Sequence, residues 1–239
     1  MNTKHIFGPI RSRRLGVSLG INLLPEKVCS LDCVYCEAGK TELLTTERKA
    51  YTRRYEIFKE LTDILKTKPK LDYITFSGIG EPTLHSDIGE FVKFLKINHH
   101  EYKVCLITNS TMFVDERIHD DLTFCDLIMP SLDAVSNEVF QKIDRPHKDI
   151  KATDIVEGLI AFRKKYKNQM WLEIFFLEGI NDTPSELALL KQACEQIKPD
   201  KVQINSLDRA GTEDWVKKVS ESRLLEIREY FKPIVAEIV

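Results

Sequence analysis

Three cysteines stand close together in the N-terminal part of the chain: Cys29, Cys33 and Cys36, in the spacing C-x3-C-x2-C. Loops this short let each thiolate reach a different iron of one cuboidal [4Fe–4S] cluster, and three protein ligands leave one iron open to another molecule. Structural zinc is the competing metal. Zinc sites of that kind take four protein ligands, however, and His5 and His85 are distant in the sequence. The spacing therefore predicts one iron–sulfur cluster.

The other three cysteines are scattered. Cys105, Cys125 and Cys194 each stand among apolar residues, and a chain of this size needs no disulfides to hold its core together. We interpret them as small buried apolar side chains.

A second segment whose residues could bind a ligand begins about 45 residues after the cysteines. It reads Ser77-Gly78-Ile79-Gly80-Glu81-Pro82-Thr83 and follows a predicted strand. Glycines let a backbone approach a ligand closely, and main-chain carbonyls beside a carboxylate can accept hydrogen bonds from an ammonium group. This segment is a candidate binding loop.

Composition limits what else the chain can be. It has 239 residues, of which 43% are hydrophobic and 30% charged, and 35 Lys and Arg oppose 37 Asp and Glu for a net charge of −2. These values exclude disordered and fibrous classes and show no overall basic excess for nucleic acid. No apolar run approaches the roughly 20 residues that span a bilayer, and residues 1–7 do not resemble a secretory signal. We expect a soluble cytoplasmic protein without membrane association.

Strand-like and helical stretches alternate along the chain. This alternation builds parallel sheets with right-handed crossovers, and six units fit a partial (β/α)6 TIM-like barrel better than a full barrel of eight. An open doubly wound sheet is the alternative. We expect one α/β domain at residues 16–239, preceded by an arginine-rich N-terminal arm at residues 1–15. The predicted strands are 16–24, 73–77, 103–108, 126–132, 171–177 and 201–207, and the predicted helices are 53–67, 87–99, 115–122, 136–143, 151–165, 184–197 and 220–231.

Polar residues follow five of the predicted strands. Turn chemistry alone places Gly, Ser and Asn after strands, but in a parallel barrel these segments converge at the carboxyl face, where ligands bind. We therefore expect a pocket there. The segments are 77–83, 108–111, 131–133, 179–181 and 205–209.

The cysteine motif, with the aromatic Tyr35 before its third cysteine, resembles the cluster signature of the radical S-adenosylmethionine (SAM) superfamily, and Gly78-Ile79-Gly80-Glu81-Pro82 resembles its glycine-rich motif. The resemblance implies that SAM binds the open iron through its amino and carboxylate groups. An electron from a low-potential donor, flavodoxin or ferredoxin, then cleaves SAM to methionine and a 5′-deoxyadenosyl radical. That radical abstracts hydrogen from a substrate.

The resemblance also implies roles for individual residues, although Asn and Ser at strand ends are equally common in plain turns. Cys29, Cys33 and Cys36 are the expected cluster ligands. Cofactor contacts are expected from Gly78, Gly80 and Glu81 at the methionyl end, from Tyr35 beside the adenine, from Asn109, Ser131 and Asp133 at ribose hydroxyls or the carboxylate, and from Asn181, Asn205 and Leu207 at the adenine.

A narrower resemblance is to the branch related to tRNA wyosine synthases (4-demethylwyosine synthase-like). It is carried by residues 8–16 and 18–22, by Ser131-Leu132-Asp133-Ala134 and by Ile143-Asp144-Arg145-Pro146. Two features depart from that branch, because no cysteine precedes Cys29 to hold a second cluster and no flavodoxin-like domain is present.

The substrate stays open at this point. tRNA is one candidate, a partner protein that receives a radical is another, and an iron–sulfur scaffold or electron carrier is the non-catalytic alternative. Arginines suit an anionic substrate, although arginines near a terminus are more often a solvated face. The candidates are Arg11, Arg13, Arg14, Arg145 and Arg209.

Overall fold

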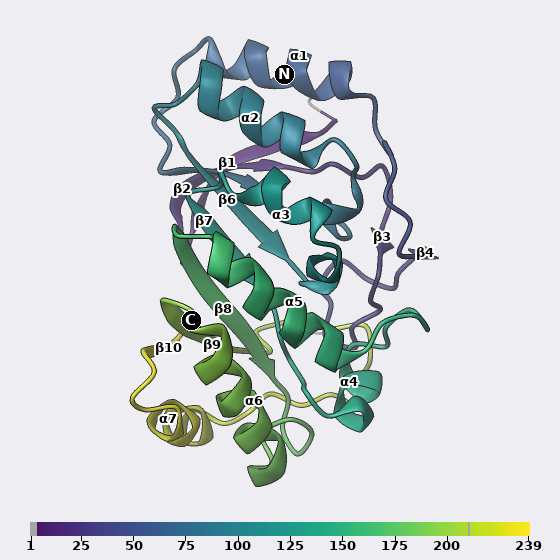
Figure 1. The fold of residues 1–239 in the computed structure, drawn as a ribbon, viewed down its shortest axis with the longest axis vertical. Coiled ribbons are helices and arrows are strands. Elements are labelled where there is room, and N and C mark those ends of the chain that lie inside the picture. Colours follow the sequence, from purple (N-terminus) through teal and green to yellow (C-terminus); the bar gives the residue numbers. More distant parts are fainter. Residues whose placement is uncertain (1–3, 210) are drawn as a thin grey trace.

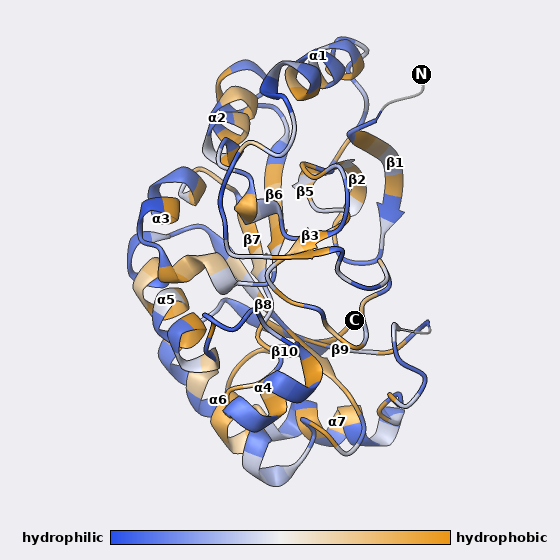
Figure 2. Cartoon of the chain, turned by 90° about the vertical axis from the view of Figure 1, so that its right-hand side faces the viewer, coloured by the Kyte–Doolittle hydropathy of each residue, from blue (hydrophilic) through white to orange (hydrophobic). Residues whose placement is uncertain are grey.

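The computed structural model describes residues 4–209 and 211–239. Eight strands form one curved sheet in the order β1-β2-β5-β6-β7-β8-β9-β10, and the helices form an outer layer around it (Figures 1 and 2). Every neighbouring pair from β2 to β10 is parallel. The partial TIM-like barrel with a single domain is therefore confirmed. The strands are β1 (Ile6–Ser12), β2 (Gly16–Ile21), β5 (Tyr73–Phe76), β6 (Lys103–Thr108), β7 (Leu127–Pro130), β8 (Gln169–Phe176), β9 (Lys201–Ser206) and β10 (Ala236–Ile238).

The helices follow the predicted alternation. The side chain of Thr183 caps α6 by accepting a hydrogen bond from the backbone N–H of Glu186, and Pro184 occupies the first turn, where its missing N–H costs nothing. The helices are α1 (Arg54–Leu65), η1 (Pro82–Leu84), α2 (Ile88–Asn98), η2 (Thr111–Val114), α3 (Arg117–Leu122), α4 (Asn137–Ile143), α5 (Ala152–Lys165), α6 (Pro184–Ile197) and α7 (Glu221–Tyr230).

The two edge strands and a small second sheet were not predicted. β1 lies within the expected N-terminal arm and pairs antiparallel with β2. Five of its seven side chains are exposed, so the strand has no alternating pattern to reveal it. Residues 1–3 of that expected arm lie outside the described residues. The small sheet joins β3 (Val28–Cys29) to β4 (Leu43–Leu44).

Side chains of β8 show how the core is divided. Met170, Leu172, Ile174 and Phe176 are fully buried in the large apolar cluster beneath the helices. Alternate residues face the barrel interior, where Trp171 packs on a second cluster containing Cys105, Leu127 and Met129. The predicted burial of the scattered cysteines is confirmed, since Cys105, Cys125 and Cys194 are free and buried.

No helix in residues 4–209 and 211–239 is long and apolar enough to cross a membrane.

Candidate functional site

A cavity of about 180 Å³ opens at the carboxyl ends of the strands. The cysteine loop forms one wall, and the segments that follow β5, β6 and β7 form the others, as the polar strand ends predict. Most of the expected ligand and cofactor contacts lie around this one space. The lining residues are Lys27, Cys29, Cys33, Tyr35, Cys36, Ala38, Ser77, Gly78, Gly80, Glu81, Pro82, Ile107, Thr108, Asn109 and Ser131.

The cysteine loop is held by backbone hydrogen bonds to its surroundings. The N–H of Thr45 donates to the carbonyl of Cys29 at 2.9 Å, the N–H of Val34 donates to the carbonyl of Ile143 at 2.9 Å, and the N–H of Cys36 donates to the carbonyl of Cys33 at 3.1 Å. These bonds position the backbone of the loop and leave the three thiol groups free to bind a ligand.

Burial makes the thiols of Cys29 and Cys33 weaker acids than a free cysteine. It raises the pKa of Cys29 to about 12 and the pKa of Cys33 well above its ordinary value. In the cluster-free chain these groups are therefore neutral thiols. Because metals bind thiolates, cluster binding has to release their protons.

The donor set fits an iron–sulfur cluster. Three sulfurs face one cavity, and the side-chain amide of Asn109 donates to the Sγ of Cys29 at 3.4 Å. Hydrogen bonds to sulfur are among the features that tune such clusters. Among the described residues no three His, Cys, Asp or Glu side chains converge on one point that could hold a single metal ion. A cuboidal cluster needs no such convergence, because each cysteine binds a different iron.

The glycines after β5 are required by close packing. Gly80 has a φ of +78°, and a Cβ there would stand 2.1 Å from the backbone carbonyl oxygen of Val28. Gly78 has a φ of +128°, and a Cβ there would stand 2.8 Å from the side chain of Asn22. The binding loop can lie against Val28 of β3 only because Gly80 lacks a side chain, and against Asn22 after β2 only because Gly78 lacks one.

Glu81 is buried and its carboxylate is used within the fold. One oxygen accepts hydrogen bonds from the N–H of Thr83 at 3.0 Å and from the hydroxyls of Thr83 and Thr108 at 2.6 and 2.7 Å. The other accepts from the N–H of Asn109 at 2.7 Å. Burial raises the pKa of Glu81, and these hydrogen bonds oppose that rise. Glu81 thus ties the loop after β5 to the loop after β6.

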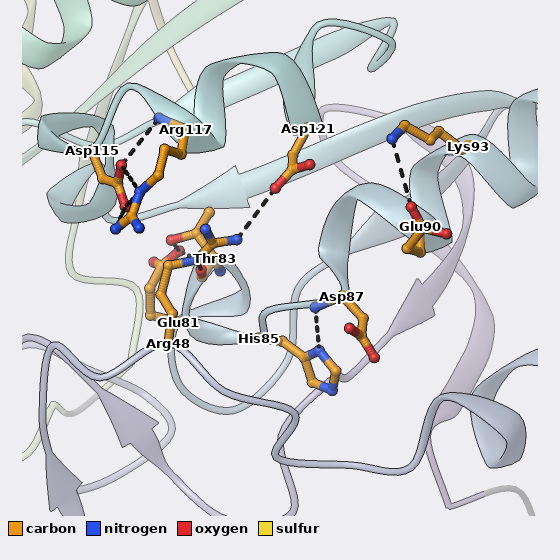
Figure 3. A network of polar contacts seen from close by, with 10 residues as sticks. All are labelled: Arg48, Glu81, Thr83, His85, Asp87, Glu90, Lys93, Asp115, Arg117 and Asp121. Atoms are coloured by element: carbon orange, nitrogen blue, oxygen red, sulfur yellow. Dashed lines mark hydrogen bonds and ion pairs between the residues drawn. The ribbon is translucent and has the colours of Figure 1, made fainter.

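A neighbouring ion pair supports the same loop from outside. Figure 3 shows Glu81 and Thr83 next to Arg48, which reaches toward Asp121 of α3. The Nε of Arg48 donates to the carbonyl of Thr83 at 3.0 Å, and its terminal nitrogen lies 3.4 Å from the carboxylate of Asp121. The binding loop is therefore anchored on both of its sides.

Tyr35 stacks on Phe175, with ring centroids 3.9 Å apart and an angle of 7° between the planes. Its hydroxyl donates to the carboxylate of Asp133, whose other oxygen accepts from the N–H of Phe175 at 2.8 Å.

Asp133 and Asp144 line a small adjoining cavity of about 40 Å³. Burial raises the pKa of Asp133 to about 6, and burial with the nearby Asp133 charge raises the pKa of Asp144 well above its ordinary value.

Three expected adenine contacts do not line the main cavity. Asn181 is fully buried: its amide nitrogen donates to the carbonyls of Asp133 and Phe175, both at 2.8 Å, and its oxygen accepts from the N–H of Leu177 at 2.8 Å. Leu207 packs in an apolar cluster, and Asn205 lies outside the cavity lining. Asn181 therefore fixes the turn after β8, which is the structural alternative for an asparagine at a strand end.

Most of the arginines considered for an anionic substrate are paired with carboxylates. Arg11 is exposed on β1. Arg14 does not lie on a free arm but reaches into the fold, half-buried, and also donates to Gln203 at 3.4 Å. Asp144 is buried, and its neighbour Arg145 pairs with Glu213 instead of with Asp144. The observed pairs are Arg13 with Asp208, Arg14 with Glu173, Arg145 with Glu213 at 2.6 Å, and Arg209 with Glu37 at 3.2 Å.

Some of these pairs fasten the segment after β9 to the cysteine loop. The backbone N–H of Thr212 donates to the carbonyl of Val34 at 3.1 Å, and its hydroxyl donates to the same oxygen at 3.0 Å. A Cβ on Gly211 would stand 2.6 Å from the Cα of Tyr35. Residues 211–213 therefore cover the backbone between the second and third cysteines.

Sequence reasoning missed two charged residues that line the cavities. Lys27 stands in the cavity wall, two positions before the first cysteine, where nothing in the spacing distinguishes it. Asp144 lines the small adjoining cavity, and the sequence marks it only as part of the Ile143–Pro146 segment. Its burial beside Asp133 depends on how α4 ends against the cysteine loop.

Comparison with known proteins identifies a family model that includes both the cysteine loop and the Gly78–Glu81 loop. Residues 25–190 match the family model described as the Radical SAM superfamily, which covers more than half of the chain. The chain belongs to the radical SAM superfamily. Solved structures that share the fold contain these cofactors: SuiB from Streptococcus suis is bound to S-adenosylmethionine, and TsrM from Kitasatospora setae holds cobalamin and a [4Fe–4S] cluster.

Two curated relatives match nearly the whole chain. A protein named GTPase Obg from Brachyspira hyodysenteriae is 38% identical over 232 residues, which are 97% of this chain and 34% of that protein, so the chain spans about a third of that relative. UPF0026 protein MJ1312 from Methanocaldococcus jannaschii is 34% identical over 233 residues, which are 97% of this chain and 72% of that protein.

Two solved structures share the fold. A radical SAM methyltransferase from Sphaerobacter thermophilus superposes with a TM-score of 0.72 at 14% identity, covering 93% of this chain and 65% of that chain. TYW1 with a lysine–pyruvate adduct superposes with a TM-score of 0.63 at 13% identity, covering 90% and 72% of the two chains. At these identities the likeness establishes the fold.

Proposed function

We propose that this radical SAM chain cleaves SAM reductively at one cluster held by Cys29, Cys33 and Cys36 and directs the radical to a substrate in the barrel mouth. The observation that carries the proposal is the convergence of the three thiols and the Gly78–Glu81 loop on one cavity. When bound and reduced, the cluster supplies the electron that breaks the C5′–S bond of SAM. Flavodoxin or ferredoxin is the class of donor that we propose.

The chain's own residues bind the cluster, orient the backbone of the cavity wall and exclude water from part of the cavity. The thiols lose their protons as they take up iron. Gly78 and Gly80 bring backbone to the cavity wall, and Glu81 orders that backbone by its bonds to Thr83 and Asn109. Cys29 and Glu81 are buried, so this part of the cavity wall excludes bulk water, which favours orientation and protects a radical.

Anaerobic incubation of the reconstituted protein with SAM and dithionite tests this proposal. We expect 5′-deoxyadenosine and methionine in equal amounts, detected by mass spectrometry, and neither product from Cys36→Ala. A wild-type protein that takes up iron and accepts electrons but forms no 5′-deoxyadenosine would instead be an electron carrier.

The arginine pairs bear on the substrate. Each of Arg13, Arg145 and Arg209 already has a carboxylate partner, so a polyphosphate would have to displace several ion pairs to bind them. We therefore favour a substrate other than nucleic acid over tRNA. A gel-shift titration of tRNA at low and physiological salt, wild type against Arg11→Ala/Arg13→Ala, should show no specific complex. Tight binding that weakens steeply with salt and is lost in the variant would restore tRNA as the substrate.

A further inference from the structure

Lys27 is an unusual lysine. Its residue is only 4% exposed, and among the described residues it is the one Lys or Arg that is buried to this degree. Its position is set by the small sheet, because the carbonyl of Lys27 accepts hydrogen bonds from the N–H groups of Glu42 and Leu43 at 3.0 and 3.3 Å. The side chain lines the cavity that holds all three cluster cysteines.

The ammonium of Lys27 lacks a carboxylate partner. It donates to the carbonyl oxygen of Gly39, but in the described part of the chain no carboxylate lies within the 4.0 Å that defines an ion pair. Other cations with mostly buried side chains have carboxylate partners: Arg14 pairs with Glu173 and Arg48 with Asp121. Leaving a buried charge uncompensated costs several kcal/mol in general, so the fold retains Lys27 at a cost in stability.

The acidic group that shares this cavity forms no ion pair with Lys27. Glu81 lines the same space, but its oxygens accept the hydrogen bonds of Thr83, Thr108 and Asn109. Apart from Tyr35, whose hydroxyl donates to Asp133, the thiols are the remaining groups of the wall that can carry a negative charge. The anion that pairs with the Lys27 ammonium is therefore a group that binds in the cavity.

We propose that Lys27 is the fixed counter-charge of the cluster, which raises the cluster's reduction potential and helps the chain to retain it. Three thiolates give an oxidised [4Fe–4S] core a net negative charge, and reduction adds one more electron. A buried cation beside the cysteines favours both steps, because net charge and surroundings set the potentials of such clusters. The inference rests on cluster binding by the three cysteines.

The proposal makes opposite predictions for the loaded and the cluster-free chain. With the cluster bound, loss of the charge removes a favourable interaction. Without the cluster the charge is uncompensated, so its loss leaves the fold as stable as before or more stable. If Lys27 were needed only for its hydrogen bond to Gly39, its replacement would destabilise both the loaded and the cluster-free chain.

Three variants separate charge from hydrogen bonding. Lys27→Gln keeps a donor for the Gly39 carbonyl and removes the charge, whereas Lys27→Arg keeps the charge. Lys40→Gln is the control, because Lys40 stands in the same loop with 72% of its side chain exposed. Each protein is reconstituted anaerobically, its iron content is measured, and the cluster is titrated potentiometrically by electron paramagnetic resonance.

We expect Lys27→Gln to be at least tenfold harder to reduce, which is about 59 mV for a one-electron couple. Lys27→Arg and Lys40→Gln should stay within about threefold of the wild type. A wild-type midpoint in Lys27→Gln would overturn the proposal and leave the proposed function intact. Failure of the wild type itself to take up iron would overturn both.

Urea unfolding of the cluster-free proteins decides the case in which Lys27→Gln does not hold a cluster. A variant that folds as stably as wild type but loses iron supports the counter-charge. A variant that is also less stable without iron has lost a structural contact, and that result would overturn the proposal.

Discussion

Asn109 donates its side-chain amide to the Sγ of Cys29 across 3.4 Å, joining the end of β6 to the first cysteine. The same amide donates to the hydroxyl of Ser30 at 3.0 Å, and its oxygen accepts from the N–H and hydroxyl of Thr111 at 3.1 and 2.8 Å. One side chain thus links the cysteine loop to the start of η2. Residues that orient metal ligands in this way contribute to affinity and activity.

Replacing Asn109 by Ala should lower the rate of 5′-deoxyadenosine formation by about tenfold, the lower end of the range for such supporting residues. The reason is that Cys29 loses its hydrogen-bond donor while its thiol stays in place. Product formation under dithionite measures the effect. Asn98→Ala is the control, since the Asn98 amide bonds only to the Phe94 carbonyl at an exposed helix end. Equal rates for Asn109→Ala and wild type would refute this role.

Gly80→Ala should destabilise the cluster-free protein by about 3 kcal/mol or more. The left-handed backbone costs about 1–2 kcal/mol for a residue with a Cβ, and the overlap with the Val28 carbonyl adds to it. That carbonyl cannot withdraw freely, because it accepts the N–H of Glu81 at 3.0 Å. Urea unfolding measures the loss.

Gly179→Ala provides the comparison for this glycine. Gly179 has a similar φ of +70°, but a Cβ there would meet nothing within 4 Å, so the variant should lose only the backbone cost of about 1–2 kcal/mol. If the two variants lose the same free energy of unfolding, the packing of the binding loop against Val28 is not what requires Gly80.

The sequence predicts the barrel well because its parallel strands and helices carry strong local patterns. Even so, β1 escapes prediction, since a mostly exposed edge strand lacks alternation. The cysteine motif and the Gly78–Glu81 loop can also be identified as candidate binding segments from the sequence, because both are defined by the spacing of residues close together in the chain.

Other site features depend on contacts between distant parts of the chain. Asn181 looks like a ligand contact in the sequence, and only its three bonds to the folded backbone show otherwise. The pairing of Arg13 with Asp208 joins residues 195 positions apart, which no local pattern encodes. Lys27 is hidden for the same reason, because its burial follows from the pairing of β3 with β4.

The buried pair of Asp133 and Asp144 should make the cluster-free protein less stable as the pH rises. Asp133 has a pKa of about 6 in the fold and about 3.9 when unfolded. Below pH 4 both states hold the proton and the stabilisation is complete. Between about pH 4 and 6 the unfolded chain releases the proton first, so the free energy of unfolding falls by about 2–3 kcal/mol.

Urea unfolding between pH 4 and 7.5 measures this dependence, with Asp133→Asn as the comparison. The variant should show a flatter profile, because it no longer titrates at this position. A wild-type profile that rises through this range relative to the variant would mean that Asp133 is held as a stabilised carboxylate.

The central claim is that Cys29, Cys33 and Cys36 together hold one cluster with an iron left open for SAM. Anaerobic reconstitution followed by iron and sulfide analysis and by electron paramagnetic resonance with and without SAM tests it most directly. We predict about four irons per chain and a spectrum that changes when SAM is added. Cys33→Ala should lose both, whereas Cys194→Ala, which alters a buried side chain of α6, should keep both at a cost of about 1 kcal/mol in stability. About eight irons, a spectrum indifferent to SAM, or equal losses in the two variants would contradict the account.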